Sequence, residues 1–533
     1  MKAADLFVAC LEEEGVERVF GLPGEELEDL LFSLDDSTIT FVPVRHEQGA
    51  AFMADVHGRL TGEAGVCMST LGPGAANLVT GVADANLDKA PLVAITGQGG
   101  LERIHKESHQ MLDVVGMLAP ITKWNTRVSD PDVVHESVRK AFKVATFEKP
   151  GAAHVELPED VAAAETEKRP LPARQRVRRP DPDVPSVDRL VERLEAAERP
   201  LVITGNGAVR TNASAALRRF VERTHYPVAS TYMGKGAVSD ADPRSLMTLD
   251  SGDEREASEA IAEADLVLTV GYDIAEHDPA GWHPREDVAV VHVDSEPAEV
   301  YEHYDPDLEI VADVGATLRL LDERSMDRDV ARDPGWYRDL RDRIVAEVSR
   351  RPEADEPFTV AGALPLLRDA MADDDVLLSD VGAHKMAIAQ RFPTYEPNTC
   401  VISNGLAAMG IAVPGAVAAD LAVEANVVAA TGDGGFLMNA AELNTATRLG
   451  CGFTVLVFND DDFGLIHEKQ TAHVGAHVGT ELTNPDVVAF ARSFGIDAHR
   501  PADWDELEVR LADAVPSPEL TLIEVPMARA SWA

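Results

Sequence analysis

Cysteine is scarce in this sequence, with four among 533 residues. Cys10, Cys67, Cys400 and Cys451 lie far apart, so no pair has the close spacing of a zinc site or a redox motif. Isolated cysteines of this kind are typical of reduced thiols in the core of a cytoplasmic protein, where disulfides are rare. The pattern therefore excludes a small secreted scaffold held together by disulfides.

Long hydrophobic stretches are also missing. No uninterrupted apolar run reaches about 18 residues, the length that a membrane-spanning helix needs. The first ten residues lack the basic start and the apolar core of a signal peptide. We therefore expect a cytoplasmic protein without membrane-spanning helices.

Positive charge is the third shortage. The chain has 48 Lys and Arg against 92 Asp and Glu, a formal net charge of -44, and only 11 of the basic residues are lysines. Such a surface repels nucleic acids and anionic membranes, which excludes both as partners. An acidic, lysine-poor surface suits molar salt, where ions screen the self-repulsion, so we interpret the composition as halophilic. A merely acidic cytoplasmic enzyme is the alternative.

Apolar strands and helical segments alternate along the whole chain, which predicts an α/β fold. The length predicts about three domains, each with a doubly wound parallel sheet. We place them at residues 1–165, 186–325 and 356–533. A polar, proline-rich stretch over 165–185 predicts a linker, and a charged stretch over 322–357 is expected to separate the second domain from the third. The first and third domains look like two versions of one plan.

Short apolar runs mark the expected strands. They are residues 18–20, 40–44, 65–69, 92–96 and 154–157 in the first domain, 200–204, 227–230, 266–270 and 289–293 in the second, and 427–430 and 453–458 in the third. Open α/β sheets bind ligands at the carboxyl ends of their strands. Side chains that follow these runs are therefore the first candidates for function.

Two acidic turns follow strands of the third domain. One is GDGG at 432–435 and the other is NDDD at 459–462, so that Asp460 lies 27 residues after Asp433. Magnesium takes oxygen ligands from carboxylates, phosphates and water, and glycines at a helix start let the backbone approach phosphate groups. The turns predict a magnesium and diphosphate site with the metal ligands Asp433, Asp460 and Asp462 and the cofactor contacts Gly432, Asp433, Gly434, Gly435 and Asp460.

These turns resemble the thiamine diphosphate motif of the acetolactate synthase and pyruvate decarboxylase superfamily. The resemblance covers nearly the whole chain through RHEQGAA at 45–51, LGPGAAN at 71–77, HQ at 109–110 before TKW at 122–124, and NGLAAMG at 404–410. It implies a pyrimidine-binding first domain, a central domain and a diphosphate-binding third domain. It also implies thiamine diphosphate and Mg2+ as cofactors, and a homodimer or homotetramer with active sites at the subunit interfaces.

Glu47 is the candidate catalytic residue. It follows a predicted strand and precedes an alanine-rich segment, 49–60, that is expected to be helical, so its carboxyl lies at the ligand-binding edge of the sheet. The resemblance implies that this carboxyl hydrogen-bonds the pyrimidine ring of the cofactor and relays a proton. A carboxyl group buried among apolar groups suits that task. The alternative is an ordinary acidic residue at a helix start.

The resemblance assigns three further residues. Met409 matches the apolar residue that packs between the two rings of the cofactor, although a methionine in an alanine-rich helix is also ordinary core. His384 matches a histidine that contacts the diphosphate. Gln110 matches a glutamine beside the bound substrate and is counted with Glu47 as catalytic, whereas His109 is more typical of a surface loop.

The segments VGYDIAE at 270–276 and TKW at 122–124 look closest to the catabolic, flavin-independent acetolactate synthases. That branch decarboxylates one pyruvate and joins the remaining two-carbon unit to a second pyruvate, which gives 2-acetolactate. FAD is expected to be absent, because the GNG turn at 205–207 is too short a glycine signal for a dinucleotide site. Glu25 and Glu26 stand where the branch commonly has a lysine, and they would repel pyruvate if they pointed into the site.

Three other functions stay open. The chain is alternatively a decarboxylase or carboligase of another 2-oxo acid, a flavin-dependent pyruvate oxidase, or a catalytically silent subunit that binds the cofactor. The presence of Glu47, Asp433 and Asp460 argues against the silent subunit. We predict a thiamine diphosphate-dependent enzyme of the acetolactate synthase type.

Overall fold

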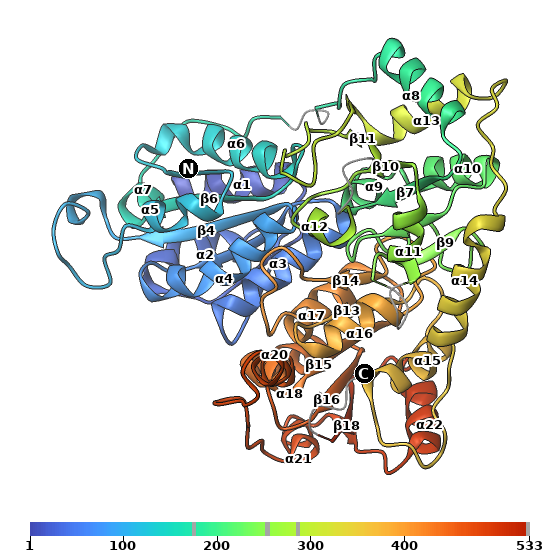
Figure 1. Cartoon of the computed structure of the whole chain (residues 1–533). Coiled ribbons are helices and arrows are strands. Elements are labelled where there is room, and N and C mark those ends of the chain that lie inside the picture. The colour runs from blue at the N-terminus through green and yellow to red at the C-terminus, as the bar shows by residue number, and fades with distance from the viewer. Residues whose placement is uncertain (173–176, 251–255, 284–287, 529–533) are drawn as a thin grey trace.

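Three parallel β-sheets of six strands each organise this chain (Figure 1). The computed structural model describes residues 1–172, 177–250, 256–283 and 288–528. An N-terminal unit (blue), a central unit (green to yellow) and a C-terminal unit (orange to red) form three lobes, each with helices packed against its sheet. The predicted α/β class with three parallel-sheet domains is confirmed, while the predicted domain boundaries stay predictions.

Every apolar run expected to be a strand forms one. The first sheet contains β1 (Arg18–Gly21), β2 (Thr40–Pro43), β3 (Gly65–Ser69), β4 (Leu92–Gln98), β5 (Trp124–Arg127) and β6 (Ala152–Pro158). The second contains β7 (Pro200–Thr204), β8 (Val228–Ser230), β9 (Ser245–Thr248), β10 (Leu266–Val270), β11 (Ala289–Asp294) and β12 (Leu308–Val311). The third contains β13 (Val376–Ser379), β14 (Cys400–Ile402), β15 (Val427–Gly432), β16 (Thr454–Asn459), β17 (Asp497–His499) and β18 (Thr521–Pro526).

The first and third sheets share one topology. Their strand orders are β2-β1-β3-β4-β6-β5 and β14-β13-β15-β16-β18-β17, the same permutation of six consecutive strands. The central sheet has the order β12-β11-β10-β7-β8-β9. The expectation that the first and third domains follow one plan is therefore confirmed.

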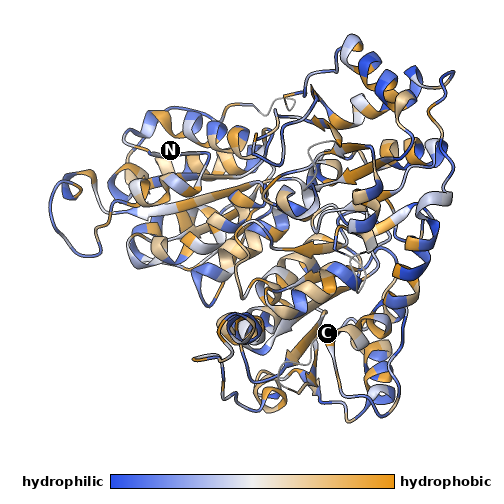
Figure 2. Ribbon diagram, in the orientation of Figure 1, coloured by the Kyte–Doolittle hydropathy of each residue, from blue (hydrophilic) through white to orange (hydrophobic). Residues whose placement is uncertain are grey.

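Two helices rich in small residues join the first unit to the third. Helix α3 (Glu47–Thr61) packs against α17 (Ala412–Ala422) and shares one apolar core with it. A Cβ at Gly415 would lie 2.8 Å from Val56 Cγ2, so the helices meet closely. Burying a side chain such as Val56 stabilises the fold by about 1.5–3 kcal/mol. Figure 2 shows that the strands are mostly hydrophobic while the outer helices carry hydrophilic residues.

The charged stretch expected to separate the second domain from the third contains a helix. Helix α14 (Gly335–Val348) packs against β9 and α11 (Glu256–Glu263) of the central unit. Tyr337, Leu340 and Ile344 are buried on one side of it, at the spacing of successive helical turns. Because these apolar residues stand three or four positions apart among charged ones, the charge content hid an amphipathic helix.

The four cysteines are buried and form no disulfide, as expected. Residues 166–172 and 177–183, within the predicted linker, contain no helix or strand. Across the described residues, no helix has the length and apolar character needed to cross a membrane.

Candidate functional site

The two acidic turns of the third unit lie at the same edge of its sheet. β15 and β16 pair in parallel with Gly432 opposite Phe458, so Asp433 and Asp460 both follow the carboxyl ends of adjacent strands. Helix α18 (Asp433–Asn439) begins at Asp433, whose side chain is buried. The sheet therefore brings together the two carboxylates that the sequence indicated.

Both carboxylates bind protons more tightly than ordinary aspartates. Burial raises the pKa of Asp433 to about 6, and a hydrogen bond from Asn484 offsets part of the shift. Burial, followed by the charge of Asp433, raises the pKa of Asp460 to about 7. Two partly desolvated carboxylates this close together favour a bound cation over two bare negative charges.

Asn484 stands among the oxygens of this site. Its amide nitrogen lies 2.5 Å from Asp433 Oδ2, 2.9 Å from Asp461 Oδ1 and 3.2 Å from Asn459 Oδ1. An NH2 group has only two hydrogens, so it cannot satisfy three acceptors at once. A set made of oxygen atoms fits a hard cation such as Mg2+, which Asp433 and Asp460 would hold. No pattern in the sequence pointed to Asn484.

Asp462, the third predicted metal ligand, has a histidine partner. Its carboxylate is buried and lies 2.5 Å from His467 Nδ1. Within the described ranges, no group of three or more His, Cys, Asp or Glu side chains is placed to share one metal ion. Asp433 and Asp460 follow adjacent strand ends, and the assignment of Asp433, Asp460 and Asp462 as metal ligands stays a prediction.

His384 lies at the neighbouring strand end. It belongs to α16 (Ala383–Arg391), which follows β13, and its ring stacks on Phe458 with centroids 6.2 Å apart. Burial lowers the pKa of His384 to about 4, so the ring is neutral. Its Nε2 atom is buried and has no hydrogen-bond partner in the part of the chain that the structure describes. An unpaired buried nitrogen is costly, so this position fits a polar group bound from outside, such as a diphosphate.

The GDGG turn at 432–435 is called here the diphosphate turn, after its predicted ligand. Two of its glycines are required by the packing of the protein itself. A Cβ at Gly434 would lie 2.7 Å from Phe463 Cε1, and one at Gly435 would lie 2.7 Å from Asp380 Oδ1. Close approach of the backbone to phosphate, the reason inferred from the sequence, is therefore not the only reason for glycine here.

Met409 lies on a loop over residues 403–411, called here the methionine loop, and not on a helix. Ala407 and Gly410 have left-handed φ values of 56° and 92°, which a helix does not allow. Met409 Cε lies 3.6 Å from the Cβ position of Gly434, so the side chain reaches the diphosphate turn. Asp380 holds the end of the loop by accepting a hydrogen bond of 2.8 Å from Gly410 N. The alanine content had suggested a helix, and the left-handed residues explain the difference.

The first unit holds the start of the methionine loop. Asp84 accepts a hydrogen bond of 2.7 Å from Ser403 Oγ, and Asp88 accepts one of 3.0 Å from Asn404 N. Arg59 lies 3.0 Å from the Asp84 carboxylate and 2.7 Å from that of Asp88. These acids of the first unit therefore secure a loop of the third.

Glu47 is the first residue of α3 and is 5% exposed. Its Oε2 accepts a hydrogen bond of 2.9 Å from Asn77 Nδ2 on α4 (Pro73–Leu87). In the described structure, no hydrogen bond or ion pair joins this carboxylate to the third unit. The sequence segment 71–77 had been singled out, but only the fold shows that its asparagine contacts Glu47.

Gln110 and His109 are exposed on the loop that follows β4. Gln110 has a left-handed φ of 56°, and its carbonyl oxygen lies 2.5 Å from the Cβ position of Gly72. The loop therefore packs against the turn that enters α4, the helix that carries Asn77. This places Gln110 on the same unit as Glu47.

The acidic pair after the first strand divides into one outward and one inward side chain. Glu25 is exposed. Glu26 is half-buried, and its Oε2 accepts a hydrogen bond of 2.7 Å from Thr70 Oγ1. Only Glu26 therefore brings a carboxylate toward the turn at 71–77.

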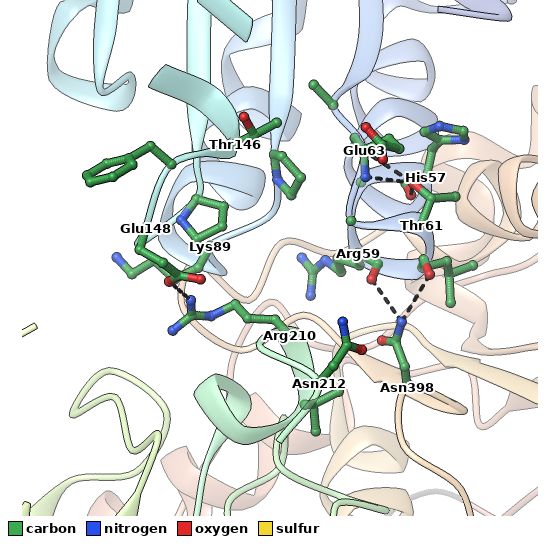
Figure 3. Close-up of a pocket in the computed structure, with 18 of the residues that line it drawn as sticks. His57, Arg59, Thr61, Glu63, Lys89, Thr146, Glu148, Arg210, Asn212 and Asn398 are labelled. Carbon is green, nitrogen blue, oxygen red and sulfur yellow. Dashed lines mark hydrogen bonds and ion pairs between the residues drawn. The ribbon is translucent and has the colours of Figure 1, made fainter. Parts of the chain in front are cut away.

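A cavity of about 1680 Å³ opens where the three units meet. Figure 3 shows Arg59, Lys89 and Arg210 around it, with Arg210 paired to Glu148. None of the predicted site residues lines this cavity. It is a space between domains, separate from the acidic turns.

Family models match three parts of the chain in the order of the three sheets. The N-terminal TPP-binding domain of thiamine pyrophosphate (diphosphate) enzymes matches residues 1–117. The central domain of these enzymes matches residues 187–321, and their C-terminal TPP-binding domain matches residues 380–525.

Known relatives cover nearly the whole chain. An acetolactate synthase from Bacillus subtilis is 32% identical over 99% of this chain and 93% of its own length. A catabolic acetolactate synthase from Raoultella terrigena is 33% identical over 98% of this chain and 94% of its own length. A probable acetolactate synthase large subunit from Methanocaldococcus jannaschii is 32% identical, with 98% and 92% covered. Because these identities are nearly equal, they do not single out the catabolic branch.

Proposed function

The chain belongs to the thiamine pyrophosphate enzyme family, where it is related to acetolactate synthases, and from this we propose that it forms 2-acetolactate from two molecules of pyruvate. One observation carries the proposal. Asp433 and Asp460 meet at adjacent strand ends in a chain that acetolactate synthases match from end to end.

The residues of the chain divide the work between two units. Thiamine diphosphate, when bound, supplies the electron sink that lets a 2-oxo acid lose carbon dioxide. Asp433 and Asp460 would hold Mg2+, and through it the diphosphate, while Met409 reaches the same turn. Glu47 presents a buried carboxylate, held by Asn77, that would hydrogen-bond the pyrimidine ring and exchange a proton with it.

Of the two acidic residues Glu25 and Glu26, only Glu25 has the solvent-facing position that supports pyruvate as the substrate. Glu25 is exposed, so water screens its charge. The carboxylate of Glu26 is directed to the Thr70 hydroxyl. Glu25 is therefore compatible with a substrate that carries a carboxylate, whereas the inward carboxylate of Glu26 favours a neutral acceptor, and product analysis decides between the two.

Product analysis tests this function. We expect 2-acetolactate and carbon dioxide from pyruvate alone, detected by mass spectrometry in molar potassium chloride with Mg2+ and thiamine diphosphate. A panel of other 2-oxo acids and aldehydes is assayed beside it. Turnover of another 2-oxo acid without acetolactate from pyruvate would overturn the substrate and leave the cofactor assignment in place, and acetaldehyde as the main product would indicate simple decarboxylation.

The central unit supports catalysis without flavin. Counted from β7, its strands follow the order of dinucleotide-binding sheets, in which a pyrophosphate lies on the helix after the first strand. At that helix, α9 (Asn206–Arg210), the Glu276 carboxylate lies 3.1 Å from Asn206 N. A Cβ at Gly207 would lie 2.5 Å from Gly271 Cα, so the two turns are in close contact. A carboxylate at the start of this helix disfavours a pyrophosphate there, which supports the flavin-independent proposal. Flavin absorbance in the purified protein would instead favour the oxidase alternative.

We propose that each active site is shared between two chains. No hydrogen bond or ion pair links Glu47 to the GDGG turn of its own chain in the described structure, although its family role requires a cofactor anchored there. Mixing the inactive variants Glu47→Gln and Asp433→Ala should therefore restore activity after subunit exchange. A mixed dimer has one site with both residues intact, so random exchange should recover about a quarter of wild-type activity.

The controls for this mixing experiment are each variant mixed with itself, which should stay inactive. Mass spectrometry of the intact dimers shows whether exchange has occurred. Mixed dimers that form without any recovery of activity would refute a shared site.

A further inference from the structure

Glu442 contributes a fully buried carboxylate that the proposed chemistry does not use. It ends the short helical turn η5 (Ala440–Glu442), which follows α18. Its Oε1 accepts hydrogen bonds from the backbone N–H groups of Arg45 and His46, both at 3.0 Å. Its Oε2 accepts a hydrogen bond of 2.6 Å from Thr445 Oγ1. Both carboxylate oxygens are therefore engaged.

The two backbone groups belong to the turn that leads directly into Glu47. N–H groups at a helix start have no partner within the helix, so they need an acceptor from elsewhere. A Cβ at Gly49 would lie 2.8 Å from Glu442 Oε1, which shows how closely the carboxylate fits this turn. Arg448 of the same segment donates a hydrogen bond to the carbonyl of Pro43, on the strand before the turn. The segment after the diphosphate turn thus holds the entry to α3.

We propose that Glu442 is a positioning residue that sets the backbone from which Glu47 reaches the pyrimidine ring. Asn77 fixes the carboxyl end of Glu47, and Glu442 fixes the backbone before it. A misplacement of about 1 Å costs on the order of 100-fold in a reaction that depends on alignment. The inference rests on the proposed thiamine diphosphate chemistry but not on the identity of the 2-oxo acid.

A residue with a purely structural role would also stabilise the fold. Burial raises the pKa of Glu442, so the charged form is costly, and the hydrogen bonds offset that cost only in part. An alanine there leaves two N–H groups without their acceptor, which lowers the stability of the fold. Loss of stability alone therefore cannot identify a positioning role, and the test needs a readout specific to Glu47.

Exchange of the C2 proton of bound thiamine diphosphate in deuterated buffer is such a readout, because it needs the proton relay and no substrate. The holoenzyme is assayed with saturating Mg2+ and thiamine diphosphate. Glu442→Ala should slow the exchange about 10- to 100-fold. Glu442→Gln keeps an oxygen that accepts the same two hydrogen bonds, so its rate should stay within about threefold of wild type. Glu47→Gln serves as the reference for loss of the relay.

Asp375 supplies a matched control in the same unit. It is also buried, and it accepts hydrogen bonds from Ala372 N at 2.7 Å and Asn426 N at 3.0 Å. These contacts lie at the amino ends of β13 and β15, whereas the acidic turns lie at the carboxyl ends of the strands. Asp375→Ala should lower the melting temperature and leave the exchange rate of the bound cofactor unchanged.

Wild-type exchange in folded, cofactor-loaded Glu442→Ala would overturn the inference, and so would exchange in Glu442→Gln as slow as in Glu442→Ala. If Glu442→Ala does not fold, Gly49→Ala decides the question. Its added methyl group pushes the carboxylate off the turn while alanine favours the helix, so wild-type exchange there also refutes positioning. Normal exchange in Glu47→Gln would instead refute the proton relay under the proposed function.

Discussion

Replacing Glu47 with glutamine should lower kcat by about 100-fold or more, because positioned proton transfer contributes about 100- to 10,000-fold in enzymes. An amide cannot relay the proton at this position. Its oxygen can still accept the hydrogen bond from Asn77, so the side chain should keep its place and α3 should stay folded. Affinity for thiamine diphosphate and Mg2+ should therefore change little. Steady-state kinetics and a cofactor titration measure the two effects separately.

Glu17→Gln is the control for this variant. Glu17 belongs to the same unit, its side chain is 77% exposed, and it pairs with Arg18 at the surface. Removing its charge should leave kcat unchanged, since exposed ion pairs contribute little. Near wild-type turnover in Glu47→Gln would show that the assigned proton relay is wrong.

Replacing Asp433 with alanine should weaken magnesium-dependent retention of thiamine diphosphate by at least about 100-fold. Removing a residue that only hydrogen-bonds a metal ligand already lowers metal affinity about 10- to 100-fold, and loss of the ligand itself should cost at least as much. The variant loses one of the two carboxylates that follow adjacent strand ends. It also removes a neighbouring charge that raises the pKa of Asp460, so Asp460 is more fully ionised in the variant, but one carboxylate remains where there were two. Titration of thiamine diphosphate with and without Mg2+ measures the loss.

Asp461→Asn is the control that shows whether the effect of Asp433→Ala comes from losing a metal ligand or only from losing a negative charge. Asp461 lies beside the same Asn484 amide, but it is exposed and has a left-handed φ of 52°, which asparagine tolerates. This variant should bind the cofactor within about threefold of wild type if exposed charge matters little. Unchanged affinity in Asp433→Ala, or equal losses in both variants, would contradict the metal site.

Ten of the twelve inner strands of the described sheets were predicted from the sequence, whereas β2 alone of their six edge strands was. Strands such as β7 and β10 are covered on both faces, so they form continuous apolar runs. Seven strands were missed, and five of these lie at sheet edges: β5, β9, β12, β14 and β17. An edge strand pairs on one side only and can be short and polar, as Trp124–Arg127 is, so its composition does not distinguish it from a loop.

Some residues of the candidate site were predictable from the sequence and others were not. Asp433 and Asp460 were predictable because each follows an apolar run, and the carboxyl ends of adjacent parallel strands meet at one edge. Asn484 and Glu442 carried no such signal. Their roles consist of single contacts to distant backbone or side-chain groups, such as the one that joins Glu442 to Arg45 across 397 residues of sequence.

By itself, the sequence determined the class of fold, the buried strands and the two acidic turns, because apolar runs and turn residues act over a few neighbouring positions. Only the tertiary structure decided which residues hold the turn before Glu47 and the methionine loop. The packing of α3 against α17 brings Glu442 to the turn before Glu47, and Asp84 and Asp88 to the methionine loop. Such contacts depend on the order of strands and the approach of helices, which no local pattern of residues encodes.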